Sequence, residues 1–248
     1  MALFDSGNSR LHFSRWDGEK VYDPVCMPYP ETIDELTEVI TDFFGEKPPK
    51  KVAACSVSAQ WREPLFTLLD RKAPGCLVVA KTAYDTGFSV NYDNPESIGV
   101  DRVLAACSAY RLFQDSCVVI DSGTAVTVDA VDENGTLAGG YIFPGLDVLS
   151  WSLSEKTILP HVSLTGTCEE IGNSTEKCIS YGMLIGFSGA VAELVKHAAS
   201  SVNCTTRIVV TGGGAEKVLS YLPFPAVHKQ HLVLEGLGYA IDTLPNYE

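Results

Sequence analysis

The stretch A-L-F-D-S-G-N-S-R-L-H-F at residues 2–13 has a close counterpart in V-V-I-D-S-G-T-A-V-T-V-D-A at residues 118–130. Each begins as an apolar run, turns at Asp-Ser-Gly, and continues as alternating apolar and polar residues. This pattern is typical of two strands joined by a tight turn. Glycine at such a turn permits positive φ and lets a ligand approach the main chain closely. Two such turns, nearly half the chain apart, predict two halves of related architecture.

The residues at these turns indicate phosphate binding. Asn8, Ser9 and Thr124 offer N–H and hydroxyl groups to phosphate oxygens. Asp5 and Asp121 would repel a phosphate unless a metal ion lay between them and it. A single Asp-Ser-Gly is more simply a common turn tripeptide. Its repetition in matching contexts favours phosphate and metal.

Composition limits the classes of partner. The 248 residues are 46% hydrophobic and 20% charged, as in an ordinary globular protein, and the net charge is −13. Because nucleic acids and anionic membranes require clustered Lys and Arg, this charge disfavours both. A small anionic ligand remains compatible, provided that local N–H groups and a cation neutralise it.

The cysteines and the apolar segments predict a cytoplasmic protein. No C-x-x-C pair occurs, and most of the cysteines lie in apolar runs, which favours buried, reduced thiols over zinc or disulfides. The N-terminus lacks the pattern of a signal peptide. The most apolar long window, 182–195, contains Gly, Ser and Glu193, so we expect a buried helix rather than a membrane span. The eight cysteines are at positions 26, 55, 76, 107, 117, 168, 178 and 204.

Strand and helix patterns alternate along the chain, which predicts an α/β fold. The expected strands are 2–4, 10–14, 20–23, 52–55, 76–80, 117–121, 124–131 and 207–211. The expected helices are 32–44, 63–71, 95–113, 175–199, 215–221 and 234–241. The helix at 95–113 lies between the two halves, which we expect at 1–114 and 115–248.

Seven motifs make the chain resemble type III pantothenate kinase, within the actin and sugar-kinase superfamily. G-x-D-R followed twenty residues later, aspartate to aspartate, by D-x-G-T-A-x-T is the most distinctive pair. The motifs are D-S-G-N-S (5–9), Y-D-N-P-E-S-I-G-V-D-R (92–102), D-S-G-T-A-V-T (121–127), G-G-Y-I-F-P-G (139–145), L-P-H-V (159–162), N-S-T (173–175) and T-G-G-G-A (211–215).

The resemblance implies a fold and a reaction. The fold is two RNase H-like halves around a nucleotide-binding cleft. The reaction is ATP-dependent phosphorylation of pantothenate to 4′-phosphopantothenate, the first step of coenzyme A synthesis, with Mg²⁺ and a monovalent cation, K⁺ or NH₄⁺. The family is dimeric, with the pantothenate pocket completed at the interface, so a homodimer is expected.

Asp101 is the expected proton acceptor, because it matches the catalytic base of the family's G-x-D-R motif. Ser97 is expected to cap the helix and so to put Asp101 in its opening turns, where a carboxylate is favoured. The simpler alternative for Asp101 is stabilisation of the helix dipole alone. Arg102 offers a planar donor fork for the substrate carboxylate or a phosphate; a surface salt bridge is its alternative.

The other substrate residues follow from the resemblance. Gly99 and Val100 leave space beside Asp101, and Tyr92 matches the family's pantothenate-contacting tyrosine, although ordinary packing also suits a tyrosine there. Thr175 matches a substrate-binding threonine, while Ser174 or Thr175 equally suits a helix cap.

For the nucleotide, the resemblance assigns the phosphates to the first turn and to Thr124. Asp121 matches the monovalent-cation aspartate, and Asp5 is the second metal candidate. Gly212 and Gly213, between a strand and a helix, suit close approach of the adenosine; a plain glycine turn is the alternative. The residues of the first turn are Asp5, Ser6, Gly7, Asn8, Ser9, Arg10, Leu11 and His12.

Two rival functions are consistent with parts of the sequence. One is a non-catalytic nucleotide-binding or regulatory protein, against which the presence of Asp101 argues. The other is a kinase of another small hydroxylated substrate in the same superfamily, against which only residues 92–102 argue.

Overall fold

The computed structural model describes residues 1–164, 171–203 and 207–247, which form two compact units. The first unit comprises Met1–Gln114, Asn134–Ala138 and His231–Glu248, and the second comprises Asp115–Glu133 and Gly139–Gln230. The units therefore differ from the predicted halves, which follow chain order. The chain returns to the first unit twice after residue 114, so the C-terminal helix completes the unit in which the chain began.

The first unit contains a five-stranded mixed sheet of order β3-β2-β1-β4-β5. The hairpin β1–β2 and the pair β2–β3 are antiparallel, whereas β4 and β5 run parallel to β1. The strands are β1 (Ala2–Ser6), β2 (Arg10–Trp16), β3 (Val21–Pro28), β4 (Val52–Ser56) and β5 (Leu77–Ala80). The helices are α1 (Ile33–Phe44), α2 (Arg62–Lys72), α3 (Val100–Phe113) and α7 (Leu232–Ala240), and the shorter elements are the 3₁₀ turns Tyr84–Thr86 and Pro95–Ser97 and the strand β6 (Ser89–Val90).

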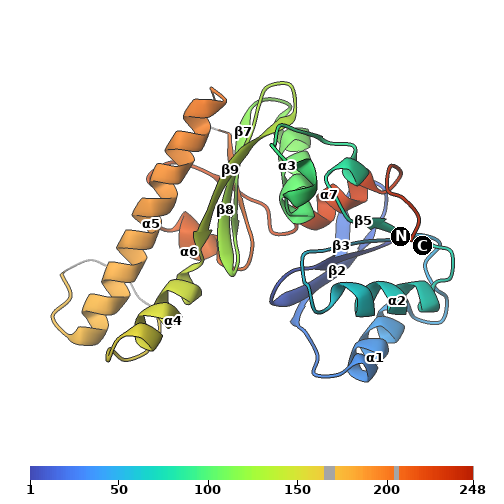
Figure 1. Ribbon diagram of the computed structural model, residues 1–248, viewed down its shortest axis with the longest axis horizontal. Coiled ribbons are helices and arrows are strands. Elements are labelled where there is room, and N and C mark those ends of the chain that lie inside the picture. Colours follow the sequence, from blue (N-terminus) through green and yellow to red (C-terminus); the bar gives the residue numbers. More distant parts are fainter. Residues whose placement is uncertain (165–170, 204–206, 248) are drawn as a thin grey trace. The chain divides into compact units, whose positions relative to one another are not determined.

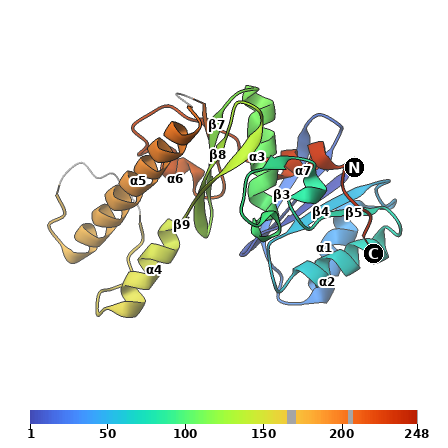
Figure 2. The same ribbon diagram turned by 45° about the horizontal axis from the view of Figure 1, so that its top comes forward.

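Helices pack on both faces of this sheet. Phe4, Leu11 and Phe13 belong to the core that includes residues of α1 and α2. Helices α3 and α7, side by side in Figure 1, contact each other and the strands β1 and β4. Figure 2 shows α1 and α2 together on their side of the sheet. Because strand residues alternate between faces, each strand of the hairpin sends every second side chain into one of these two layers.

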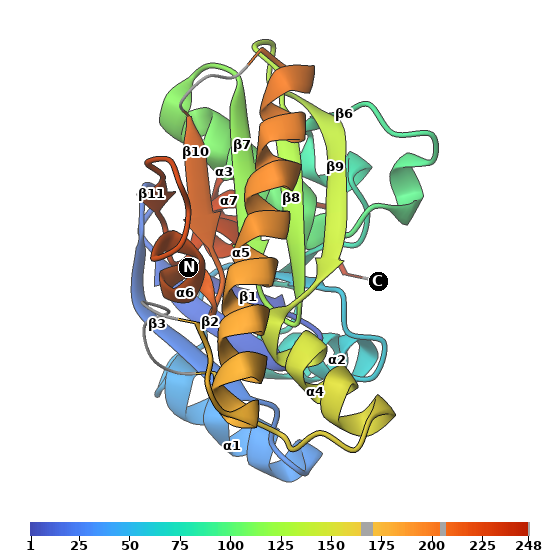
Figure 3. The same ribbon diagram turned by 90° about the vertical axis from the view of Figure 1, so that its left-hand side faces the viewer.

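The second unit is built on the larger sheet, whose order is β11-β10-β7-β8-β9-β6. β6 of the first unit pairs with the beginning of β9, residues that also belong to the first unit. Helix α5 lies along the strands β7 and β8, as Figure 3 shows. The strands are β7 (Cys117–Ser122), β8 (Ala125–Val131), β9 (Thr136–Pro144), β10 (Ile208–Thr211) and β11 (Val227–His228), and the helices are α4 (Leu146–Lys156), α5 (Thr175–Ser201) and α6 (Ala215–Leu219).

Both Asp-Ser-Gly stretches form the predicted hairpins. Gly7 N–H bonds the Arg10 carbonyl (3.0 Å), and Gly123 N–H bonds the Ala125 carbonyl (3.0 Å). Neither Gly7 nor Gly123 has positive φ, so that part of the prediction is wrong. At these two turns glycine leaves the main chain without a side chain over it, and it does not adopt a left-handed conformation.

The strand β9, the helix α4 and the two-residue strands β6 and β11 were not predicted, β3 extends to Pro28 beyond the predicted 20–23, and the start of α3 moved. β9 has a glycine pair in its middle and α4 has three serines, so neither shows a clear period. Helix α3 begins at Val100 after Gly99, and Ser97 ends the preceding 3₁₀ turn with its Oγ bonded to the Asn94 carbonyl (2.7 Å). Ser97 therefore does not cap α3. The first-turn position of Asp101 is nevertheless correct.

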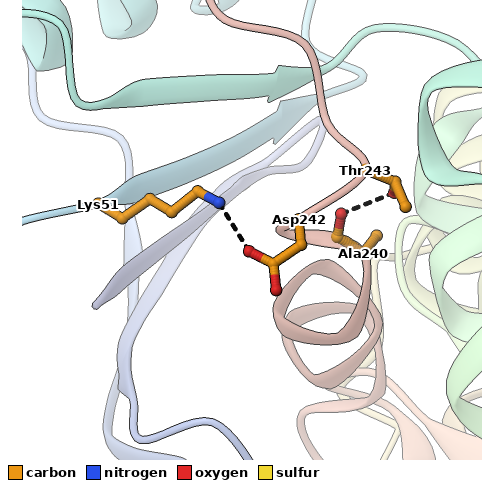
Figure 4. Close-up of polar contacts among 4 residues, drawn as sticks. All are labelled: Lys51, Ala240, Asp242 and Thr243. Carbon is orange, nitrogen blue, oxygen red and sulfur yellow. Dashed lines mark hydrogen bonds and ion pairs between the residues drawn. The ribbon is translucent and has the colours of Figure 1, made fainter.

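The C-terminal segment is joined to the first unit by several bonds. Lys51 Nζ lies 2.8 Å from Asp242 Oδ1, and Thr243 Oγ1 donates to the Ala240 carbonyl (2.8 Å), as Figure 4 shows. The main chain of Tyr247 bonds the Leu77 carbonyl (3.0 Å). These contacts attach the residues after α7 to the strands β4 and β5.

Helix α5 (Thr175–Ser201) closely matches the predicted helix at 175–199, which was expected to be buried rather than to span a membrane. In the part of the chain that the structure describes, it is the one helix long and apolar enough to cross a membrane by length and composition. Its residues Leu184, Phe187, Val191 and Val195 are buried, and they recur at helical spacing along the side that contacts β7 and β8. This is the pattern of a helix that packs against a sheet.

Six of the cysteines lie among the described residues, and all six are thiols rather than disulfides. Cys55 and Cys117 are buried, as predicted, but Cys26 and Cys178 are exposed. Cys168 and Cys204 lie outside the described residues.

Candidate functional site

The first turn is held from behind by Tyr29. Its hydroxyl lies 2.6 Å from Ser6 Oγ and donates to the Gly7 carbonyl (2.8 Å). Its ring stacks on Trp61 with centroids 4.9 Å apart. Burial raises the pKa of Tyr29, so the phenol remains a donor. Sequence reasoning missed Tyr29, because it follows β3, far from the turn along the chain.

The residues of the turn divide into a buried set and an exposed set. Ser6 is fully buried, whereas Asn8, Ser9 and Arg10 at the tip are exposed and able to meet a ligand. Leu11, expected among the nucleotide residues, is fully buried in the core. Strand alternation turns its side chain to the face opposite His12, so Leu11 supports the turn rather than offering its side chain to a ligand.

A polar row crosses the other face of the first sheet. Asp5 is opposite His12 on β2 and opposite Cys55 on β4. The Cys55 thiol donates to Asp5 Oδ1 (3.5 Å). Burial, followed by the charges of Asp5 and Asp101, raises the pKa of Cys55 well above its usual value. The two carboxylates expected to act in chemistry and metal binding thus share one thiol neighbour.

Burial, His231 and Arg10 together lower the pKa of His12. The imidazole is therefore neutral at physiological pH. Arg10 supplies a permanent positive charge at the tip of this turn.

Asp101 lies in the first turn of α3, with its Oδ1 accepting from the Arg102 N–H (2.9 Å). The same oxygen lies where a side chain on Gly99 would begin: a Cβ there would come within 2.5 Å of it. Val100 is buried and anchors the start of the helix. Gly99 thus leaves the space that the Asp101 carboxylate occupies, while Val100 is part of the core.

Arg102 is 7% exposed, which excludes a surface salt bridge. Its Nη1 lies 3.5 Å from the Tyr92 hydroxyl, and its guanidinium lies 5.9 Å from the centre of the Tyr92 ring. The structure therefore brings Tyr92, Gly99, Val100, Asp101 and Arg102 together at the start of α3.

In the second unit, Asp121 lies at the end of β7, against the glycine loop. Thr211 on β10 and Thr127 on β8 are its register partners. Gly214 N–H bonds the Ser122 carbonyl (2.8 Å). Gly212 has φ +87°, and a Cβ there would collide with Asp121 Oδ1 and the Ser122 main chain. The loop after β10 therefore packs directly on the second Asp-Ser-Gly turn.

Thr127 belongs to the second turn motif, but sequence reasoning did not single it out. Among the described residues its buried Oγ1 has no hydrogen-bond partner. A buried hydroxyl without a partner is rare and requires an explanation. Because Thr127 is directly opposite Asp121, this oxygen and the carboxylate are two potential ligands on one face of the sheet.

Thr124 is exposed at the tip of the second turn, and its carbonyl accepts from Gly145 N–H (2.9 Å). Gly213, in the loop after β10, is exposed, and a Cβ added to it would have no atom within 4 Å. Thr124 and Gly213 are therefore two positions in the second unit that are open to a ligand.

Thr175 is the first residue of α5, and the helix is capped by Ser174, whose Oγ accepts from Lys177 N–H (3.3 Å). The capping role thus belongs to Ser174. Thr175 is exposed and lines a cavity of about 770 Å³. The other lining residues are Leu153, Leu159, Gly172, Asn173, Ser174, Cys178, Ile179 and Gly182.

The described residues contain no group of three or more His, Cys, Asp or Glu side chains arranged for a metal ion. Mg²⁺ does not require one, because it commonly binds through one or two carboxylates together with water and substrate phosphates. Asp5 and Asp121, each next to exposed donors at a turn, fit this mode.

A family model described as type III pantothenate kinase matches residues 1–197. Curated proteins named type III pantothenate kinase match nearly the whole chain. One from Desulfatibacillum aliphaticivorans is 33% identical and covers 99% of both chains. One from Parafrankia sp. is 31% identical, over 96% of this chain and 95% of its own.

Solved structures agree on the fold. A protein of Campylobacter jejuni described as a Baf family transcriptional activator has a TM-score of 0.66 at 22% identity, with 98% of both chains covered. A ROK family glucokinase from Streptomyces griseus, in complex with glucose and AMPPNP, has a TM-score of 0.57 at 12% identity over 98% of both chains. MreB 5 of Spiroplasma citri, bound to AMPPNP, has a TM-score of 0.53 at 11% identity, over 95% of this chain and 93% of its own. The predicted fold class, that of sugar kinases and actin-like proteins, is confirmed.

Proposed function

The chain belongs to the type III pantothenate kinase family, and on that premise we propose that it transfers the terminal phosphoryl group of ATP to the primary hydroxyl of pantothenate. The product is 4′-phosphopantothenate, the first intermediate on the route to coenzyme A. The observation that carries the proposal is the family match over residues 1–197, which contains both Asp-Ser-Gly turns and the G-V-D-R segment. The cysteine thiols suit a reducing compartment, and we assign the reaction to the cytoplasm.

Asp101 is the proton acceptor in this proposal. Phosphoryl transfer to an alcohol needs a group that takes the hydroxyl proton and rigid positioning of both reactants. Asp101 is partly exposed. Its carboxylate accepts a hydrogen bond from the Arg102 N–H and occupies space that a side chain on Gly99 would fill. A carboxylate in the first turn of a helix is also stabilised in its ionised form by the helix dipole.

Arg102 and Tyr92 recognise the carboxylate end of pantothenate. The buried guanidinium can give two parallel hydrogen bonds to a carboxylate, which fixes the orientation of the substrate relative to Asp101. Tyr92 lies against the same guanidinium and limits its movement. Thr175 contributes a hydroxyl from the 770 Å³ cavity.

The nucleotide is bound by the two turns and the glycine loop. Asn8, Ser9, Arg10 and Thr124 are exposed donors for the phosphates, and the loop at Gly212 and Gly213 admits the adenosine. Asp5 would hold Mg²⁺ together with the phosphates. A bound Mg²⁺ neutralises the charge that develops on the phosphates during transfer.

A monovalent cation, K⁺ or NH₄⁺, is assigned to Asp121. The buried Thr127 Oγ1 opposite this carboxylate supports the assignment, because a cation ligand would satisfy it. We expect activity to require K⁺ or NH₄⁺ in addition to Mg²⁺. The Thr127→Val variant, equal in shape but without the oxygen, should raise the K⁺ concentration for half-maximal activity by about tenfold. Full activity in sodium buffer with trace K⁺ removed would contradict the assignment.

The active form is a homodimer through α5. The face of α5 away from the sheet carries Gly182, Gly186 and Gly189, where an added Cβ would meet no atom of another element within 4 Å. Ile185 on the same helix is 57% exposed. Small residues on an apolar helix face allow close approach of a second helix. Gly182 also lines the cavity with Thr175, so a second copy on this α5 face would enclose that cavity.

The substrate is tested by measuring ADP release with Mg-ATP and K⁺, using pantothenate against a panel of sugars and short hydroxy acids. Phosphorylated pantothenate should appear by mass spectrometry only in the first reaction. Turnover of a sugar in place of pantothenate would show the rival kinase. Nucleotide binding without turnover of any acceptor would indicate the regulatory alternative. The Campylobacter jejuni protein does not favour that alternative, because at 22% identity it shows the fold alone.

A further inference from the structure

Cys26 lies in an unusual group of side chains on the outer strand of the first sheet. It is directly opposite His12 across the pair β2–β3, and its Sγ lies 3.7 Å from His12 Nε2. Arg10, two residues before His12 and so on the same face, has its Nη1 3.7 Å from the same sulfur. The strand register thus brings a thiol, an imidazole and a guanidinium together.

Cys26 is also exposed to solvent. Cys26 is exposed on β3, whereas Cys55, in the same row of the sheet, is fully buried. Thiols react as thiolates, and a nearby cation together with solvent access identifies the reactive ones. Arg10 supplies that cation permanently. Cys26 meets both conditions, whereas Cys55 is buried and lies next to the Asp5 carboxylate.

The other exposed thiol among the described residues provides a contrast. Cys178, near the start of α5, donates a hydrogen bond to the Gly172 carbonyl (3.2 Å). Arg10 places a permanent positive charge beside Cys26, whereas the contact of Cys178 is with a neutral carbonyl oxygen. The chain therefore contains a reactive cysteine and its own internal control.

We propose that Cys26 is a site of thiol–disulfide exchange with small anionic disulfides. The Cys26 thiol gives its proton to water, and its thiolate attacks one sulfur of the disulfide R–S–S–R. A new S–S bond joins Cys26 to R–S, and the second R–S⁻ leaves and takes up a proton. Cys26 is thereby oxidised and half of the reagent is reduced. Arg10, with its Nη1 3.7 Å from the sulfur, attracts the anionic reagent to Cys26.

The adduct has a consequence that rests on the proposed function. Arg10 is one of the exposed donors assigned to the nucleotide phosphates. An anionic group attached to Cys26 would occupy its guanidinium and repel a triphosphate. Modification of Cys26 should therefore weaken ATP binding, and reduction should restore it.

The chemistry is tested on the full chain without turnover. The protein is treated with 5,5′-dithiobis(2-nitrobenzoate), which is anionic, or with the neutral 2,2′-dithiodipyridine, and the modified cysteine is identified by peptide mass mapping. Cys26 should react at least about ten times faster than Cys178 with the anionic reagent. The Arg10→Met variant should slow that reaction about five- to tenfold and change the reaction with the neutral reagent much less. Equal rates at Cys26 and Cys178, or an unchanged anionic rate in Arg10→Met, would overturn the proposal.

ATP affinity is then measured by calorimetry before and after modification. Modified wild type should lose at least about tenfold in affinity and regain it with dithiothreitol, while Cys26→Ser should be insensitive to the reagent. Modification at Cys26 with unchanged ATP affinity would overturn the link to the nucleotide. Because the rate measurement needs neither ATP nor pantothenate, failure of the kinase assignment and failure of this proposal give different results.

Discussion

At the scale of single residues, Gly99 and Gly212 have the same relation to an aspartate, one in each unit. A side chain on Gly99 would begin where Asp101 Oδ1 lies, and one on Gly212 would collide with Asp121 Oδ1. In both cases glycine is needed for the space that it leaves to a carboxylate. Asp101 and Asp121 therefore both occupy space that a residue without a side chain leaves open.

Asp101→Asn tests the proton acceptor, because it keeps size and shape and removes basicity. General-base contributions are typically about 10²–10⁴-fold, so kcat should fall by that order while ATP affinity changes little. If Asp101 served only the helix dipole, the variant would lose about 0.3–1 kcal/mol of stability and keep its kcat. Measuring kcat and the thermal midpoint on the same protein separates the two roles.

Gly212→Ala tests the glycine loop and has a matched control next to it. Gly212 has φ +87° and no room for a methyl group, so the variant should lose about 1–3 kcal/mol of unfolding free energy and bind ATP less tightly. Gly213 has neither restriction, and Gly213→Ala should be near wild type in stability. Denaturant unfolding of both variants measures the difference. Equal stability of the two would contradict the assigned role of Gly212.

At the scale of elements, the end of β3 positions the β1–β2 turn through Tyr29. Strands β1 and β2 form the hairpin, but the hydroxyl that contacts Ser6 and the Gly7 carbonyl comes from the residue after β3. The stack on Trp61, just before α2, fixes that hydroxyl in turn. The phosphate turn is thus held by elements that follow it in the chain.

Tyr29→Phe should keep the stack and remove the hydroxyl. Because Ser6 and the Gly7 carbonyl lose a partner, we expect about 1–2 kcal/mol of lost stability and a higher KM for ATP, with a smaller change in kcat. Tyr22→Phe, at an exposed position on β3, is the control and should change neither quantity. An unchanged KM for ATP in Tyr29→Phe would show that the turn keeps its form without this hydroxyl.

At the scale of the whole molecule, the surface of α5 decides the assembly. Ile185→Asp introduces a charge among the glycines of that face, and burying an unpaired charge in an interface is strongly unfavourable. We expect the variant to sediment as a monomer and to bind pantothenate less tightly, because the cavity at Thr175 would lack its second wall. Tyr84→Asp, at a 64% exposed position in the first unit, should remain a dimer. A wild-type monomer in sedimentation would refute the proposed assembly outright.

The sequence by itself determined the local elements and the class of protein. Both Asp-Ser-Gly hairpins, the long helix α5 and the first-turn position of Asp101 follow from patterns that are local in the sequence. Such patterns reflect turn chemistry, capping and the period of burial, which act locally. The motif order then identified the family, which the family model and the curated relatives bear out.

Only the tertiary structure decided which distant residues meet. Tyr29 next to the first turn, Cys55 opposite Asp5 and Thr127 opposite Asp121 depend on strand pairing, and no local pattern reports its register. The same holds for the C-terminal helix α7, which joins the first unit through α3 although it ends the chain. Strand pairing and helix packing are contacts between segments far apart in sequence, so their energies are expressed only when the chain has folded.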